Sequence, residues 1–460
     1  MRTILRTAVL AFCLATVTAE AFEQQPVAAA IIGRFAKGPV GSPVQVSLGE
    51  FRDLYGTATP TDWPAELQAR RYFAQGVLKL NVIRVNPDGP LSTALFGDPA
   101  AMTGLYALPL VRDFGILLCP EITLLPTAEI KPALAIWKAE LSKRRAMMII
   151  DPPPGMTTPT LMAQWVTQNI PPGSKELVLY YPYLTASING TPATFGASGQ
   201  MAAAWLTNDI EPDQWIWGAP AGNQLPLVAT SMSPVLNNNT STIVTDVYVC
   251  VIRQFTTGGP IIPYSARHLD GGNPENRYIP IQRTTDWIKT NIERMGTLSD
   301  NRLNDSTLWT ELVTTAQTFL QYVDQNGGFP GNTPAESFYV RCSLGQTMTQ
   351  ADINAHVVKM EVGIALLQPS EFTILQFQWN TRNPARPLEA PQLLMREGFT
   401  GKQIFYKTPP GATYTLTSSP TLGGWTQYAA PLPGDDTWRK AAFVPEPGKK
   451  FFRVEQTPLP

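Results

Sequence analysis

The residues best suited to bond-breaking chemistry surround His268, one of two histidines in the 460-residue chain. Ser265 lies three residues before it, and Asp270 lies two residues after it. A serine, a histidine and a carboxylate are the residue types that nucleophilic hydrolysis uses. However, Asp270 opens an Asp-Gly-Gly-Asn run that is typical of a turn. We therefore interpret His268 as a loop residue rather than a catalytic base.

Other candidate chemical sites are weaker. The second histidine, His356, has no acidic or cysteine partner at the spacing of metal ligands. Asp151 ends a predicted parallel strand, where catalytic carboxylates often lie. Three prolines follow Asp151, which favours a turn-capping role instead. The run Trp215-Ile-Trp217 has the residue types of an aromatic ligand shelf, but we interpret it as core.

Sequence motifs that would indicate catalysis or a cofactor are missing. Gly196-Ala-Ser-Gly199 does not have the five-residue spacing of a nucleophile elbow. There is no phosphate loop, no dinucleotide fingerprint and no HExxH motif. We predict that the chain is not an enzyme, with no catalytic residue, no metal site and no cofactor.

The cysteines do not form a metal or disulfide framework. Cys13, Cys119, Cys250 and Cys342 include no CxxC pair. Cys119 and Cys250 lie in apolar, strand-like runs. We predict that these two are buried free thiols.

Composition narrows the class of protein. Apolar residues make up 44% of the chain, which indicates a globular protein. The 35 basic residues are balanced by 36 acidic ones, so the sequence does not predict nucleic-acid binding. The 43 prolines and 34 glycines indicate many loops.

The N-terminus has the three parts of a secretory signal peptide. Residues 1–6 are basic, 8–17 are apolar, and Ala19-Glu-Ala21 has the small residues of a cleavage site. The alternative is a short apolar arm that packs on a neighbouring chain. No later segment is apolar enough to predict a membrane span.

The order of elements predicts an α/β fold. Apolar strands at 27–34, 81–85, 114–119, 146–150 and 177–181 are separated by amphipathic helices. This pattern is typical of a mostly parallel sheet covered on both faces. A polar break at 238–242 and a further strand at 243–252 are predicted next, followed by helices near 288–295 and 308–323. Beyond a linker at 384–391, short strands predict a small all-β appendix.

A β-hairpin is predicted between Met360 and Phe377. Two apolar runs of alternating pattern flank Gln368-Pro-Ser-Glu371. A two-stranded ribbon is only marginally stable in water, so its edges are predicted to be covered. The hydrophobic positions that we expect at a strand-exchange interface are Val362, Ile364, Leu366, Phe372, Ile374 and Phe377.

Several short motifs, in a shared order, resemble contractile-tail sheath proteins. They begin with Ile31-Ile-Gly-Arg-Phe-Ala-Lys-Gly-Pro39 and Glu50-Phe-Arg-Asp-Leu-Tyr-Gly56. They continue through Arg144-Arg-Ala-Met-Met-Ile-Ile-Asp-Pro-Pro153 and Arg277-Tyr-Ile-Pro-Ile-Gln-Arg283. Glu336-Ser-Phe-Tyr-Val-Arg-Cys342 and Glu361-Val-Gly-Ile-Ala365 resemble the family's C-terminal signature. The resemblance spans about 28–377.

The resemblance implies a structural subunit of a contractile tail sheath. Such subunits polymerise helically around an inner tube and contract. The expected partners are copies of the chain, the inner tube protein and baseplate-like components, assembled in the cytoplasm or virion. The implied fold is a non-catalytic, subtilisin-like α/β domain with an α+β C-terminal sheath domain. The expected segments are a leader or arm (1–21), an N-terminal sheath segment (22–110), the α/β domain (111–255), the C-terminal sheath domain (256–384) and the linker with the appendix (385–460).

Both termini depart from the family pattern. A leader-like segment stands where the family has an extended arm, and residues 385–460 extend beyond the usual end of the chain. Export would conflict with cytoplasmic assembly. A second hypothesis is therefore an exported or surface-associated β-rich binding protein that retains a sheath-derived core. A third is a hydrolase that uses Ser265 or His268.

Overall fold

The computed structural model describes residues 28–368 except 57–62, 112–113, 212–213, 271, 273–275 and 297–301. Beyond these it describes 392–398, 401–408, 412–419, 426–427, 431–433, 438–441 and 451–458. The chain divides into two compact units, Met1–Glu371 and Phe372–Pro460. The predicted leader lies outside the described residues.

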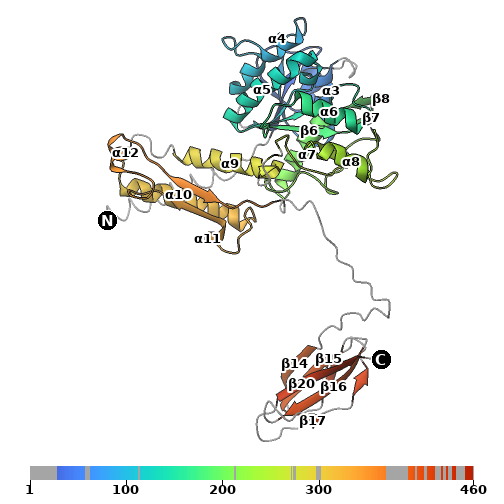
Figure 1. Ribbon diagram of the computed structural model, residues 1–460, viewed down its shortest axis with the longest axis vertical. Coiled ribbons are helices and arrows are strands. Elements are labelled where there is room, and N and C mark those ends of the chain that lie inside the picture. The colour runs from blue at the N-terminus through green and yellow to red at the C-terminus, as the bar shows by residue number, and fades with distance from the viewer. Residues whose placement is uncertain are drawn as a thin grey trace. The chain divides into compact units, whose positions relative to one another are not determined.

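An eight-stranded sheet forms the centre of the first unit (Figure 1). Its spatial order is β11-β10-β6-β5-β4-β1-β3-β2. All neighbours are parallel except the two edge pairs, β10–β11 and β3–β2. The mostly parallel α/β sheet predicted from the sequence is confirmed. The strands are β1 (Ala28–Gly33), β2 (Val44–Val46), β3 (Leu80–Arg84), β4 (Phe114–Leu118), β5 (Met147–Ile150), β6 (Leu177–Tyr181), β10 (Cys250–Arg253) and β11 (Ile262–Pro263).

Helices cover both faces of this sheet, because alternate side chains of each strand enter two separate cores. In β1, Ala29 and Ile31 enter one core, and Ala30 and Ile32 enter the other. The first core is covered by α2 (Leu48–Leu54), α3 (Pro64–Ala74) and α7 (Ser198–Ile210). The second is covered by α4 (Leu91–Phe96), η1 (Gly104–Leu110), η2 (Ile122–Leu124), α5 (Thr127–Arg144), α6 (Pro159–Asn169) and α8 (Asn238–Thr245).

The segment 238–252 differs from its prediction. It was expected to be a polar break followed by one strand, but its first part is the helix α8 and only β10 is strand. Asn237 caps α8: its side chain accepts from the N–H of Thr240, whose hydroxyl in turn accepts from the N–H of Asn237. This reciprocal cap favours the helix over the β-branched composition of the segment.

A three-stranded antiparallel sheet follows β6 and was not predicted. It contains β7 (Tyr183–Ile188), β8 (Thr191–Phe195) and β9 (Ser231–Ser233). Asn189 and Gly190, both with positive φ, form the turn between β7 and β8. Asn-Gly between alternating residues is a strong hairpin signal, so this element was readable from the sequence.

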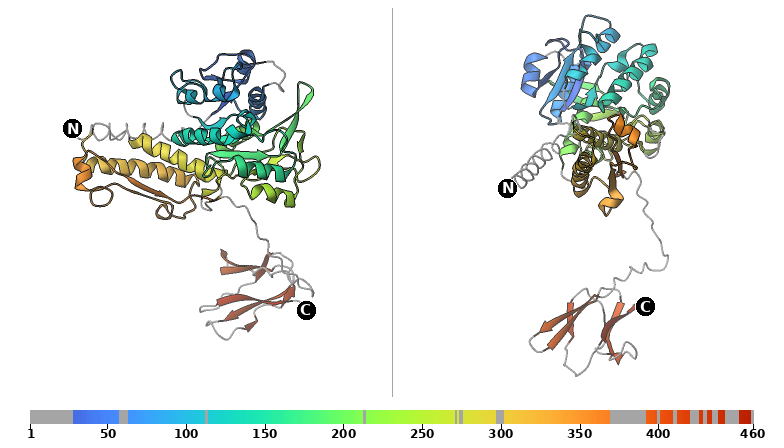
Figure 2. Two further views of the ribbon diagram at one scale, coloured as in Figure 1. Left: turned by 45° about the horizontal axis from the view of Figure 1, so that its top comes forward. Right: turned by 90° about the vertical axis from the view of Figure 1, so that its left-hand side faces the viewer.

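The rest of the first unit is built on two long helices, α9 (Ile279–Gly296) and α10 (Ser306–Gln325). They lie side by side in Figures 1 and 2. Short elements complete this part: α11 (Pro334–Ser337), β12 (Phe338–Arg341), α12 (Gln350–Asn354) and β13 (Glu361–Ile364). Their core contains Trp217, Trp287 and Phe319. The ring centroids of Trp217 and Trp287 are 6.4 Å apart, and those of Trp287 and Phe319 are 5.3 Å apart.

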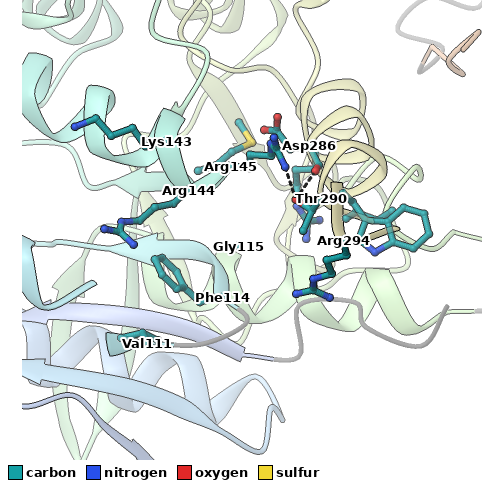
Figure 3. A pocket seen from close by; sticks show the side chains of 13 residues that line it. Val111, Phe114, Gly115, Lys143, Arg144, Arg145, Asp286, Thr290 and Arg294 are labelled. Atoms are coloured by element: carbon teal, nitrogen blue, oxygen red, sulfur yellow. Dashed lines mark hydrogen bonds between the residues drawn. The ribbon is translucent and has the colours of Figure 1, made fainter. Parts of the chain in front are cut away.

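Two polar contacts join the sheet domain to α9. Arg283 of α9 forms a bidentate ion pair with Asp209 of α7, with distances of 2.7 Å and 2.5 Å. Arg145, directly after α5, pairs with Glu293 of α9 and donates to the hydroxyl of Thr290 at 3.3 Å. These contacts connect α9 to the helices α5 and α7 of the sheet domain. Figure 3 shows the contact between Arg145 and Thr290, beside a pocket that both residues line.

We expect Arg145→Gly to be more stable than Arg145→Ala by about 1 kcal/mol. Arg145 ends α5 in the left-handed region, at φ 55° and ψ 42°, where glycine is the favoured residue. Both substitutions remove the contact with α9, but only glycine also removes the backbone strain. Urea unfolding of the two variants gives the difference. Equal stability would show that this conformation costs nothing here.

The described residues of the second unit form antiparallel sheets, as the predicted all-β appendix requires. One sheet has the order β14-β15-β19; in the other, β16 pairs with β17, β18 and β20. The strands are β14 (Gln392–Gly398), β15 (Gly401–Lys407), β16 (Ala412–Ser419), β17 (Thr426–Gln427), β18 (Leu432–Pro433), β19 (Trp438–Ala441) and β20 (Phe451–Pro458).

Candidate functional site

The first half of the predicted hairpin is a strand, but the partner that the structure shows for it is β12. β13 pairs with β12 in antiparallel register, with Ile364 opposite Phe338 and Val362 opposite Val340. These apolar side chains, with that of Leu366 just beyond β13, pack on the core of α9 and α10. Val362 and Ile364 thus face one core, as the alternation predicted, but Leu367 packs on that core together with Leu366, so the alternation does not continue beyond β13.

The other half of the prediction lies outside the described residues. Phe372, Ile374 and Phe377 were expected to form the second strand and, with the first, a joint to another copy. Their pairing, and the interface role of all six residues, stay predictions.

The backbone of β13 presents hydrogen-bonding groups away from β12. The N–H of Ala365 donates to the carbonyl of Ser337 at 2.8 Å, and these two residues are opposite in register. Bonded and non-bonded pairs alternate along an antiparallel ladder. Gly363 is therefore bonded to β12, whereas the N–H and C=O groups of Val362 and Ile364 point outward.

Among the described residues, this sheet has two strands, so both outer edges lack a strand partner. By the same alternation, the backbone N–H and C=O groups of Val340 in β12 point away from β13. Unpaired strand edges are templates for an added strand. Val340 and β12 were not included in the predicted interface. The alternation of Phe338 and Val340 with Tyr339 and Arg341 was the signal that could have identified them.

The solvent-facing side of the two strands is polar and ordered. The Tyr339 hydroxyl donates to Glu361 at 2.7 Å, which raises the pKa of Tyr339. The guanidinium of Arg341 lies 4.6 Å from the Tyr339 ring centroid. The Tyr339 ring covers Gly363, where a Cβ atom would collide with it. These side-chain contacts connect β12 and β13 across the exposed face of the short sheet.

The catalytic candidates are not assembled into a triad. His268 is 1% exposed; its Nδ1 accepts from the N–H of Asp270 at 3.2 Å, and its Nε2 contacts the carbonyl of Asn276. Burial lowers the pKa of His268 to about 4. The Ser265 hydroxyl accepts from the N–H of Val251 at 2.9 Å. Both ring nitrogens of His268 thus have backbone partners, and the Ser265 hydroxyl is hydrogen-bonded to β10 instead of to His268.

Asp151 does not cap the turn that follows it, as its interpretation expected, but contacts the start of the helix α7, which is distant in sequence. It accepts from the N–H and the hydroxyl of Ser198, both at 2.8 Å, at the start of α7. Burial raises the pKa of Asp151 to about 6 despite these bonds. Ser198 comes from Gly196-Ala-Ser-Gly199, so two weak chemical candidates form one buried structural contact.

The remaining candidates also have structural roles. Trp215 and Trp217 stack with centroids 5.0 Å apart and pack in the α9–α10 core, as predicted. His356 is exposed and lies two residues after the end of α12. Cys119 and Cys250 are buried free thiols, as predicted. Within the described part of the chain, no three His, Cys, Asp or Glu side chains are grouped as a metal site, and no helix is long and apolar enough to cross a membrane.

Comparison with known proteins identifies the fold. No family model matches the sequence, and no curated protein matches it. The structure is similar to the contracted helical sheath of the anti-feeding prophage (AFP), with a TM-score of 0.61 and 22% identity over 77% of this chain and 94% of that chain. A chain of the AFP baseplate gives a TM-score of 0.62 and 23% identity, with the same coverage.

A third similar structure is the contracted PVC sheath complex of an extracellular contractile injection system. Its TM-score is 0.62, at 18% identity over 78% of this chain and 94% of that chain. The resemblance to sheath proteins that the sequence motifs suggested is thus confirmed at the level of fold. The chain has the fold of the sheath proteins of contractile injection systems.

Proposed function

We propose that this chain is a structural subunit of a contractile sheath. The observation that carries the proposal is the extent of the structural match, which covers nearly all of the sheath chain of two injection systems. The engaged His268 and Ser265 agree with a building block rather than an enzyme.

The outward edges of β12 and β13 support a mode of assembly. An added strand from another copy would bond to the outward backbone groups of Val362 and Ile364, which is β-augmentation. Head-to-tail contacts that do not close into a ring would generate a helical assembly, as a tube requires. Contraction would then be a rigid-body rotation of subunits that remain joined by the exchanged strands.

The finer organisation belongs to the same proposal. The eight-stranded sheet would be the subtilisin-like domain, and α9 to β13 the C-terminal sheath domain, with boundaries near 110, 255 and 384. The partners would be copies of the chain, an inner tube and a baseplate-like component, in an assembly built in the cytoplasm or carried on the virion. The similar chain from the AFP baseplate structure supports a place next to baseplate components.

We expect Ile364→Pro to abolish polymerisation and Ile364→Ala to retain it. Both variants lose the same packing on the α9–α10 core, but only proline removes the outward N–H of residue 364. Proline is tolerated at a strand position whose N–H does not bond within the sheet. Sedimentation velocity and negative-stain microscopy of the full chain, with and without an inner-tube protein, measure assembly. Far-UV circular dichroism verifies that the proline variant folds.

Two results would count against this proposal. Tubes formed equally by Ile364→Pro and Ile364→Ala would show that β13 is not the joint. A wild-type chain that stays monomeric at high concentration, even with the tube protein, would exclude the sheath function itself.

A further inference from the structure

The strand β8 forms one edge of the three-stranded sheet β8-β7-β9; β7 and β8 are labelled in Figure 1. The side chains of Thr191, Pro192 and Thr194 are exposed on this strand. The edge of a sheet presents unpaired backbone N–H and C=O groups, which are templates for a strand of another chain. Whether β8 can accept such a strand depends on which of its backbone groups point outward.

The turn before β8 determines these groups. The two-residue Asn-Gly turn at 189–190 places Ile188 opposite Thr191. The first and fourth residues of such a turn are joined by a hydrogen bond, and bonded and non-bonded pairs alternate from there. Thr191 is therefore bonded to β7, whereas the backbone groups of Pro192 and Thr194 point away from β7.

A hydrogen bond on the other side of β7 agrees with this assignment. The carbonyl of Thr185, in β7, accepts at 2.7 Å from the N–H of Thr230, the residue directly before β9. The backbone groups of Thr185 thus point to β9 and not to Thr194, which lies opposite in β8. Thr185 and Thr194 form a non-bonded pair, so the backbone groups of Thr194 point outward.

Pro192 occupies one of the two outward positions. Proline has no N–H, so an added strand would find a carbonyl at this position but no donor. Proline is tolerated here because the missing N–H would not have bonded within the sheet. Charged side chains also protect edges, but β7, β8 and β9 contain no Lys, Arg, Asp or Glu. Pro192 is therefore the blocking residue of an exposed and uncharged edge.

The other edges in the first unit are managed differently. At β11, the carbonyls of residues 261 and 263 accept from N–H groups of the segment 222–227, which covers this edge. β2 and β9 have three residues each, and very short strands are poor templates. β12 and β13 contain no proline, and the backbone groups of Val340, Val362 and Ile364 point outward from them. Among the described strands, the open edges are thus those of the proposed joint.

We propose that Pro192 blocks strand addition at β8 and thereby confines it to β12 and β13. This inference rests on the proposed sheath function, in which copies of the chain join by strand addition. Without the proline, the β8 edges of two copies could pair antiparallel about a two-fold axis. Such a contact closes into a dimer, whereas a tube requires contacts that do not close. Pro192 is thus a residue that determines the specificity of assembly.

Pro192→Thr tests the proposal in the Ile364→Pro background, which removes the proposed joint at β13. Threonine restores the N–H, and neighbouring threonines already occupy exposed positions of β8. We expect the double variant to dimerise with an association constant about tenfold or more above that of the background, because a two-fold axis uses the restored N–H twice. Sedimentation velocity over a concentration series measures the constant and distinguishes dimers from larger assemblies.

Three further variants identify the cause of dimerisation. Thr194→Pro, added to Pro192→Thr, moves the proline to the other outward position and should return self-association to that of the background. Pro192→Ala restores the same N–H with a smaller side chain and should also dimerise. Thr191→Val is the matched control: it changes an exposed residue of β8 whose N–H already bonds to β7, so self-association should not change. Far-UV circular dichroism verifies that each variant is folded.

Two results would overturn the proposal. If Pro192→Thr and Pro192→Ala self-associate no more than the background, the proline does not close this edge. If dimers persist after Thr194→Pro is added, the contact does not use the edge of β8. Neither result bears on the sheath function, which is measured by polymerisation of the wild-type chain. If the wild-type chain stays monomeric, the sheath function fails, and the same comparison is made without Ile364→Pro.

Discussion

Arg283→Met should separate α9 from the sheet domain, with a loss of about 3–5 kcal/mol in the free energy that holds them together. The ion pair with Asp209 is buried, with exposed side-chain fractions of 4% and 1%. Burial raises the pKa of Asp209, and Arg283 is the cation that opposes this shift. Removing Arg283 leaves Asp209 buried without its counter-ion, so it must either stay charged without a partner or take up a proton. The Trp205 ring also loses a guanidinium that lies 5.1 Å from its centroid.

Native-state hydrogen exchange measures this effect where it occurs. Amides of α7 and α9 should lose at least about a hundredfold of their protection, since each 1.4 kcal/mol is a factor of ten. Asp209→Leu combined with Arg283→Met should recover much of the loss, because no unpaired buried charge remains. Arg302→Met, which breaks the more exposed pair with Glu311, should change stability by about 1 kcal/mol or less. Unchanged protection of α9 in Arg283→Met would show that this pair does not hold the joint.

The parts of the fold that were predictable share a physical cause. The strands at 114–119, 146–150 and 177–181 are buried on both faces, so an uninterrupted apolar run was sufficient to identify each. The helix α10 was identified by its 3.6-residue spacing of Leu308, Leu312 and Leu320, all buried in the structure. In these elements the local pattern and the tertiary environment require the same residues.

The features that were not predicted depend on contacts between residues far apart in the sequence, or on a helix cap that outweighs the local composition. The α8 segment has strand-like β-branched residues, and the reciprocal cap by Asn237 and Thr240 decided for helix. Asp151 and Ser198 meet across 47 residues, and Arg145 and Glu293 across 148. Such pairs become visible only when the topology is known.

Only half of the candidate joint could be judged from the structure. The alternation predicted correctly that Val362 and Ile364 face the core, but it did not predict that Leu367 packs there beside Leu366. The pairing of β13 with β12 could not be predicted, because the partner of a strand depends on how the chain between the two strands, residues 342–360, folds back. The outward backbone groups follow from that pairing, not from the alternation itself.

The pH dependence of stability should reveal two buried groups that act in opposite directions. The pKa of Asp151 is raised from 3.8 to about 6, so its contribution is fully present below pH 3.8 and is lost as the pH rises through about 6. The pKa of His268 is lowered from 6.5 to about 4, so its contribution is present above pH 6.5 and is lost as the pH falls toward about 4. Each shift corresponds to about 3 kcal/mol, and between pH 4 and 6 the two largely cancel.

Asp151→Asn should therefore reveal the contribution of His268 to the pH dependence of the free energy of unfolding. The amide can still accept from the N–H of Ser198 and can donate to its hydroxyl, so the cap of α7 is retained without a titrating group. The free energy of unfolding of the variant, relative to that of wild type, should rise by about 3 kcal/mol from pH 4 to pH 7. Urea unfolding at intervals of half a pH unit measures this difference. Asp352→Asn is the matched control, because the pKa of Asp352 is about 2 and its titration lies below this range. If Asp151→Asn and wild type have parallel profiles, Asp151 is ionised throughout, and the burial of its carboxylate is offset by Ser198 more completely than its geometry indicates.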